Sequence, residues 1–163
     1  MSMLEVAQWL SQTPVSVAIQ SALWLIPLLQ TIHILAIAMV ISSVFMIDLR
    51  IWRMVSLEPM ADTAHRFVPW LWAGLILLAG SGLTLIVGEP KRSLPNPVFQ
   101  IKMLLLLVAI AATCAFQLSL RRNSAIWDDA AGRRLMQLLA VGTLVLWCAI
   151  AVASRWIAYI KVG

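Results

Sequence analysis

Four long apolar runs constrain the fold of this chain more than any other feature. They cover residues 23–47, 67–87, 98–120 and 135–160. Each has the length of about 20 residues that an α-helix needs to cross the hydrocarbon core of a bilayer. Apolar residues make up 62% of the 163-residue chain, which is more apolar surface than a soluble domain of this size can bury. The sequence therefore predicts an integral membrane protein in a lipid bilayer.

The connections between the runs predict how the helices are arranged. Gly88-Glu89-Pro90 and Pro95-Asn96-Pro97 break the apolar pattern between the second and third runs. Arginine pairs end the third run and precede the fourth. Short connections favour antiparallel neighbours. We therefore expect an all-α fold, a single transmembrane domain over residues 1–163 that forms an up-down four-helix bundle.

The residues before the first run predict a short helix at the membrane surface. Apolar side chains between Leu4 and Leu10 fall mostly on one side of a helix, and Thr13-Pro14 ends the pattern. The segment has no positive charge and no small-residue cleavage site. We therefore expect an interfacial helix over about residues 3–12 rather than a signal peptide.

Lysine and arginine are divided unequally between the two sides of the predicted bundle. Seven lie on the side reached after the first and third runs: Arg50, Arg53, Arg66, Arg121, Arg122, Arg133 and Arg134. Five lie toward the other side: Lys91, Arg92, Lys102, Arg155 and Lys161. Cytoplasmic loops contain the excess of positive charge, so we expect a multi-pass membrane protein with both termini outside the cytoplasm, which in a bacterial inner membrane is the periplasmic side. The net charge of +5 is too small and scattered to predict nucleic-acid binding.

His33 lies near the middle of the first run, where a polar side chain is costly and needs a partner. Gln30 precedes it by about one helical turn. One interpretation is a neutral histidine hydrogen-bonded to a backbone carbonyl or to Gln30. The other is an axial ligand to haem iron, because neutral imidazole is a good iron ligand in this setting. The residues leave both interpretations open.

Two cations lie close to the outer ends of the third and fourth runs. For Lys102 and Arg155 taken singly, a side chain that extends to the headgroups is a sufficient explanation. Together with His33 they occupy the middle or outer half of one small bundle, where cations would pair with haem propionates. The candidate cofactor-binding residues are therefore His33, Lys102, Arg155 and Gln30. His33 is the candidate metal ligand, and the expected cofactor is a non-covalent haem b, because the chain lacks a Cys-x-x-Cys-His motif.

Other polar and small residues lead to weaker expectations. His65 opens the second run at the opposite face, roughly 15 Å from the bilayer centre, so one haem between His33 and His65 is not expected. Asp48 is expected to form an interfacial ion pair with Arg50 or Arg53. The glycine-rich stretch 74–82 would let either another helix or a flat macrocycle approach closely, and the residues do not decide between these.

The chain also resembles known membrane proteins. A family of small bacterial four-helix membrane proteins of unassigned function is similar to it in the string His33-Ile-Leu-Ala-Ile, in Asp48-Leu-Arg50, in the glycine-rich second run and in Asn96-Pro-Val-Phe-Gln-Ile-Lys102. More distantly, His33, Arg50 and Lys102 resemble the layout of haem-containing membrane protoporphyrinogen oxidases and of copper-resistance D-type proteins. In the oxidases a first-helix histidine and a third-helix lysine are functionally important, which the resemblance transfers to His33 and Lys102. The chain departs from the oxidases at residues 38–43, where they typically show an aromatic-Ala-Gly stretch.

These observations predict a b-type haem-binding inner-membrane protein that works in electron transfer or oxidises a small hydrophobic substrate. It would act with a membrane or periplasmic redox partner or as a homo-oligomer, and the residues do not decide whether it is an enzyme. One alternative is a non-enzymatic subunit that scaffolds or docks a larger complex. The other is a metal or small-solute transporter, although the eight methionines are dispersed instead of lining one path.

Overall fold

In the part that it describes, the computed structural model consists of helices joined by short turns. It describes the backbone of residues 3–54, 59–122 and 133–156, and the side chains of residues 3–54, 59–119 and 137–154. The helices are α1 (Met3–Ser11), α2 (Pro14–Ser21), α3 (Leu25–Ile51), α4 (Met60–Gly88), α5 (Pro90–Ser93), α6 (Pro97–Arg122) and α7 (Arg133–Trp156). Four of them, α3, α4, α6 and α7, are long and apolar enough to cross a membrane. The prediction of an all-helical, multi-pass membrane protein is therefore confirmed for these residues.

The long helices extend beyond the apolar runs that predicted them. The second run began at Phe67, but α4 begins at Met60. Its first two turns contain the polar side chains of Asp62 and Arg66, and both are exposed. Hydropathy detects only the stretch that lies in hydrocarbon, whereas the helix continues into the headgroup region. The apolar runs therefore located the spans but not the helix ends.

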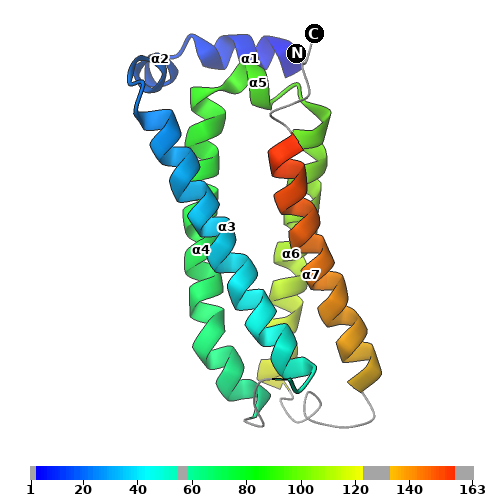
Figure 1. Cartoon of the computed structure of the whole chain (residues 1–163). Coiled ribbons are helices and arrows are strands. Elements are labelled where there is room, and N and C mark those ends of the chain that lie inside the picture. Colours follow the sequence, from blue (N-terminus) through cyan, green and yellow to red (C-terminus); the bar gives the residue numbers. More distant parts are fainter. Residues whose placement is uncertain (1–2, 55–58, 123–132, 157–163) are drawn as a thin grey trace.

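The four long helices alternate in direction and form two pairs. The closest pairing joins α3 to α4, while α6 packs on α7 and α7 packs on α3. Figure 1 shows that the pairs converge toward the end where α3 finishes and separate toward the end covered by α1. We call these the opposite end and the α1 end. One core cluster, formed by Val40, Val44, Leu71, Leu75, Ala109, Trp147 and Ile150, contains residues of all four helices.

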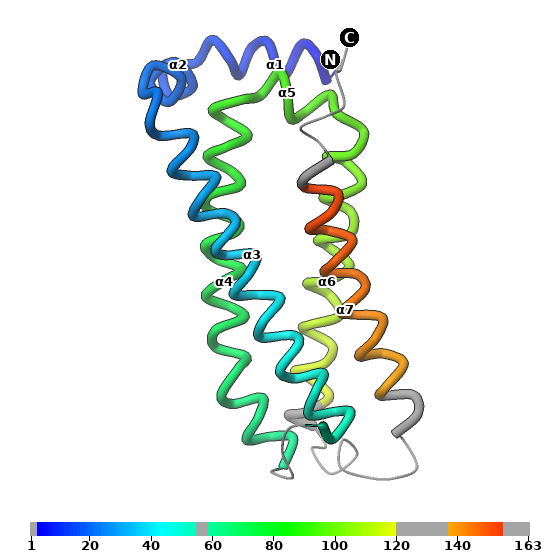
Figure 2. Tube along the Cα trace, viewed as in Figure 1, coloured from blue at the N-terminus to red at the C-terminus, as the bar shows by residue number. Residues whose placement is uncertain are grey.

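Three short helices cover the α1 end. In Figure 2, α1 runs across the ends of the long helices. The predicted helix over residues 3–12 is present as α1, but α2 was not predicted. Thr13 caps α2 by accepting a hydrogen bond from the Ser16 N–H at 3.4 Å, and Pro14 occupies the first turn. The fully buried Ser16 hydroxyl donates to the Val87 carbonyl at 2.6 Å. This bond fixes α2 to the last turn of α4.

The breaker cluster before the third run forms the cap of α6. Asn96 is fully buried, and its Oδ1 accepts a hydrogen bond from the Val98 N–H at 2.9 Å. Pro97 follows at the first position of α6, where a missing N–H costs nothing. The Gln100 N–H donates to the Asn96 carbonyl at 3.2 Å. These bonds set where α6 begins, and so place Lys102 in its second turn.

Candidate functional site

Glycines of α4 let α3 approach at two separate levels. A Cβ built on Gly74 would lie 2.7 Å from Val40 Cγ2 and 3.3 Å from the Ala36 carbonyl oxygen. Gly74 therefore serves close helix packing. A Cβ on Gly82 would lie 3.3 Å from Cε1 of His33, so Gly82 makes room for the imidazole. Gly80 faces open space. The glycine-rich stretch thus allows both close helix packing, at Gly74, and close approach of the His33 ring, at Gly82.

His33 is bound to α4 by a hydrogen bond between helices. Its Nδ1 lies 2.8 Å from Oγ of Ser81, one residue before Gly82. The imidazole is half-buried, and Ser81 is buried. Of the two expected partners, a backbone carbonyl and Gln30, neither is used; the partner is the Ser81 hydroxyl. Gln30 is exposed.

The Ser81 hydroxyl also decides which imidazole nitrogen holds the proton. It has one hydrogen, which it donates to the Leu77 carbonyl at 2.7 Å. Its oxygen must then accept from the His33 Nδ1–H. In this tautomer Nε2 has no proton and presents its lone pair. Metal-binding histidines in proteins are usually held in the same way, with one ring nitrogen anchored and the other free to coordinate.

Lys102 of α6 is close enough to His33 of α3 to act on it electrostatically. Its side chain is not exposed, and its charge acts electrostatically on the imidazole. The structure therefore brings two of the predicted site residues, His33 and Lys102, to the same region.

Two further residues that the sequence singled out are Arg155 and His65. Arg155 lies in the last turn of α7, and its side chain is outside the described residues. His65 is exposed on α4, about 24 Å along the helix axis from Ser81 at a rise of about 1.5 Å per residue. This separation agrees with the expectation that a single haem does not bridge the two histidines.

Histidine, cysteine and acidic side chains do not cluster in groups of three or more in the part of the chain that the structure describes. A bare metal ion normally needs three or four protein ligands. A single anchored imidazole is instead typical of a metal whose other ligands come from a macrocycle. The described residues therefore do not offer a group of three such ligands around His33.

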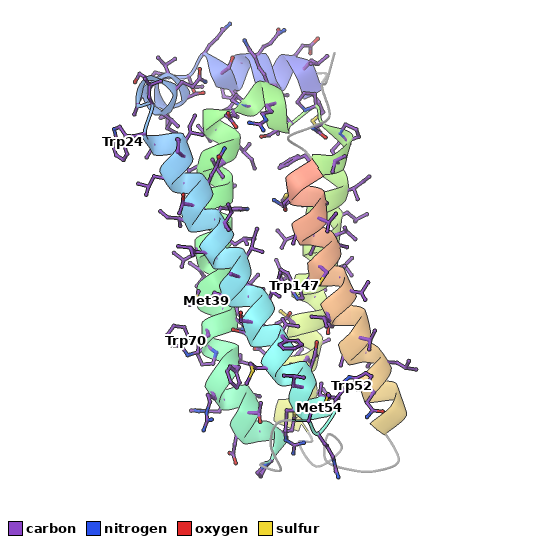
Figure 3. All side chains as sticks on the ribbon, viewed as in Figure 1. Trp24, Met39, Trp52, Met54, Trp70 and Trp147 are labelled. Atoms are coloured by element: carbon purple, nitrogen blue, oxygen red, sulfur yellow. The ribbon has the colours of Figure 1, made fainter. Side chains whose placement is uncertain are left out.

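A second feature was not predicted from the sequence. Asp48 was expected to pair with Arg50 or Arg53 at the membrane surface. The structure buries Asp48, with 7% of its surface exposed, and places it in the wall of a cavity of about 310 Å³. Figure 3 shows Trp147, which also lines this cavity, between the helices, while Trp24 and Trp70 point outward. One indication of this feature was present in the sequence: Asp48 directly follows the first apolar run, so it lies on the same helix as that run.

Comparison with known proteins identifies the family of this chain. Residues 23–160, which include all four long helices, match the profile of a family of unknown function, DUF6644. The chain belongs to this family. The match includes His33, Ser81 and Lys102, and it agrees with the expected family of unassigned function. Neither the curated proteins nor the solved structures gave a match.

Proposed function

We propose that this DUF6644 member binds one b-type haem non-covalently, with His33 Nε2 as an axial iron ligand. The observation that supports it is the chain of two hydrogen bonds from His33 to Ser81 and from Ser81 to the Leu77 carbonyl. This arrangement fixes the ring, fixes its tautomer and leaves one nitrogen as a ligand.

The surroundings of His33 suit the rest of the macrocycle. Gly82 has no side chain to crowd the imidazole, because a Cβ there would lie 3.3 Å from Cε1 of His33. Lys102 would pair with a propionate, and Arg155 is the second candidate for that role. A haem supplies one-electron redox chemistry when bound. The chain would hold it, orient it and exclude water from its faces.

In this proposal the protein is an up-down four-helix bundle of the bacterial inner membrane. The unequal distribution of lysine and arginine supports periplasmic termini, with Asp48 and Arg50 toward the cytoplasm. The haem would then lie in the periplasmic half. That position suits electron exchange with a membrane or periplasmic partner, or oxidation of a small hydrophobic substrate.

The test is a visible spectrum of detergent-purified protein, oxidised and then reduced with dithionite, after expression with haem supplied. We expect a Soret band, with α and β bands on reduction, in the wild type and in His65→Ala. We expect His33→Ala to enter the membrane normally and to lack these bands. His65 is exposed, so the pair of variants separates ligation from a general effect of losing a histidine.

Two results would contradict the proposal. If His33→Ala kept its full haem content, the ligand would be another residue. If the wild type showed no absorption bands with haem supplied, the bond between His33 and Ser81 would be purely structural. The non-enzymatic scaffold subunit would then be the better explanation, and His33→Leu would be tolerated.

A further inference from the structure

The cavity next to Asp48 lies in the half of the molecule away from α1. Residues of all four long helices form its walls, and most of them are apolar. Trp147 of α7 and Phe116 of α6 provide aromatic surfaces. The volume of about 310 Å³ falls at the lower end of the range of about 300–1,000 Å³ for small-molecule sites. It exceeds the roughly 150 Å³ of an apolar cavity that holds benzene. The space therefore suits one ring with a short substituent. We call it the Asp48 cavity.

Asp48 is the polar feature that makes this cavity unusual. Its carboxyl interacts with the Thr143 hydroxyl of α7, but that hydroxyl already donates to the Ala140 carbonyl at 2.8 Å. Oδ2 of Asp48 is buried and has no hydrogen-bond partner among the described residues. Of the two other hydroxyls in the wall, that of Thr113 donates to the Ala109 carbonyl at 2.9 Å, and Ser119 has an interaction of its own. Neither threonine therefore has a second proton to offer to Oδ2.

A buried carboxyl oxygen without a donor destabilises the folded protein unless something else supplies the hydrogen. A ligand with an O–H or N–H group would supply it. A neutral donor is favoured over an ammonium group, because the ammonium would require a second charge to be buried in apolar surroundings. The aromatic walls favour a ring, which packs edge-to-face or offset against Trp147 and Phe116.

We infer that the Asp48 cavity binds a small lipophilic phenol, whose hydroxyl donates to Oδ2 of Asp48 and whose ring and alkyl group fill the apolar space. The site is distinct from the proposed haem site. Asp48 and His33 lie on the same helix, about 22 Å apart along its axis at a rise of about 1.5 Å per residue. The inference does not depend on haem binding.

The experiment compares 4-propylphenol with propylbenzene by isothermal titration calorimetry. The protein is reconstituted in lipid nanodiscs, and heats from protein-free nanodiscs are subtracted. We expect saturable binding of the phenol at one site per chain, about tenfold tighter than that of propylbenzene, because only the phenol donates to Asp48. Equal affinities for the two compounds would overturn the role of Asp48. Absence of saturable binding would overturn the site and leave a cavity filled by water or lipid.

Two matched pairs of variants locate the site. Asp48→Leu should lower phenol affinity to that of propylbenzene, while the exposed Asp62→Leu should leave it unchanged. Ala112→Phe, which adds a ring to the cavity wall, should abolish binding of both compounds, while Ala111→Phe on the exposed face of the same helix should not. Binding that survives Ala112→Phe would contradict the inference. The two-compound comparison on the wild type still decides it if a variant fails to fold.

The haem spectrum measured on the same preparations separates this inference from the proposed function. Phenol binding without haem bands would leave the Asp48 cavity established and refute the haem proposal. Haem bands without phenol binding would support the haem proposal and refute the inference about the Asp48 cavity.

Discussion

Removing the Ser81 hydroxyl tests the central element of the proposed site. In Ser81→Ala the Nδ1–H of His33 loses its acceptor, and the imidazole is free to rotate or to change tautomer. The bond is short, at 2.8 Å, and links two helices. The half-buried ring would find water as a partial substitute. The variant therefore keeps the iron ligand but loses what holds it in place.

The expected size of the effect follows from this geometry. Loss of the hydrogen-bond partner of a metal-binding histidine typically costs about 10–100-fold in affinity. Partial rescue by water places Ser81→Ala near the lower limit, at about tenfold, or about 1.4 kcal/mol. The free energy of unfolding should fall by only about 0.6 kcal/mol, the average for hydrogen bonds between helices in a membrane. Haem affinity should thus change more than stability does.

The assay is titration of haem into haem-free protein in detergent, followed by Soret absorbance, with unfolding in SDS measured in parallel. Thr84→Val is the matched control. It also removes a hydroxyl from α4, but the Thr84 hydroxyl donates only to the Gly80 carbonyl of its own helix, at 2.9 Å. If Ser81→Ala bound haem as tightly as Thr84→Val, Ser81 would not orient the ligand. A loss of stability as large as the loss of affinity would point to general unfolding of the site.

Three further substitutions test the neighbouring contacts. Lys102→Met should weaken haem binding by about tenfold, because it removes a charged partner of a propionate. Lys91→Met, at an exposed lysine, should leave haem binding unchanged. Equal affinities of the two variants in a haem titration would show that the Lys102 ammonium has no such role. Gly74→Val should lower the free energy of unfolding by roughly 1–3 kcal/mol, because its Cβ would overlap Val40. Gly82→Val should displace the His33 ring and shift the Soret band with little loss of stability. Gly80→Val is the control, because a Cβ there meets open space, and it should change neither the stability nor the Soret band. SDS unfolding measures the stability and visible spectra measure the Soret band; an unchanged value for Gly74→Val or Gly82→Val, respectively, would contradict the expectation.

Much of the fold could be predicted from the sequence, because in a membrane protein a long apolar run has one main cause, a helix that crosses the bilayer. A helix that crosses hydrocarbon must be apolar over about 20 residues, and this made the four spans predictable. The short helix α2 was missed because its eight residues show no run and no strong periodicity. Contact with the end of α4 stabilises it, including the bond from Ser16 to Val87. Such contacts between segments distant in sequence have no local signal.

The candidate site was predictable only in part for the same reason. His33 and Lys102 could be singled out because ionisable groups within spans are costly. The sequence could not show that Ser81 is the partner of His33, because serine is an ordinary residue in membrane helices and often bonds its own backbone. Nor could it show which of three glycines meets the imidazole. The cavity beside Asp48 was not predicted, because a carboxylate at the end of an apolar run is also typical of the membrane interface, and the sequence does not show which side of the helix is buried.

The bond between Ser16 and Val87 has a consequence for biosynthesis. The two residues are separated by 71 positions in the sequence, and α1 likewise contacts α5, which follows α4. As the chain leaves the ribosome, the contacts of α1 and α2 with α4 and α5 therefore cannot form until the second span has been made and inserted. The order of synthesis therefore places the docking of α1 and α2 after the insertion of α3 and α4.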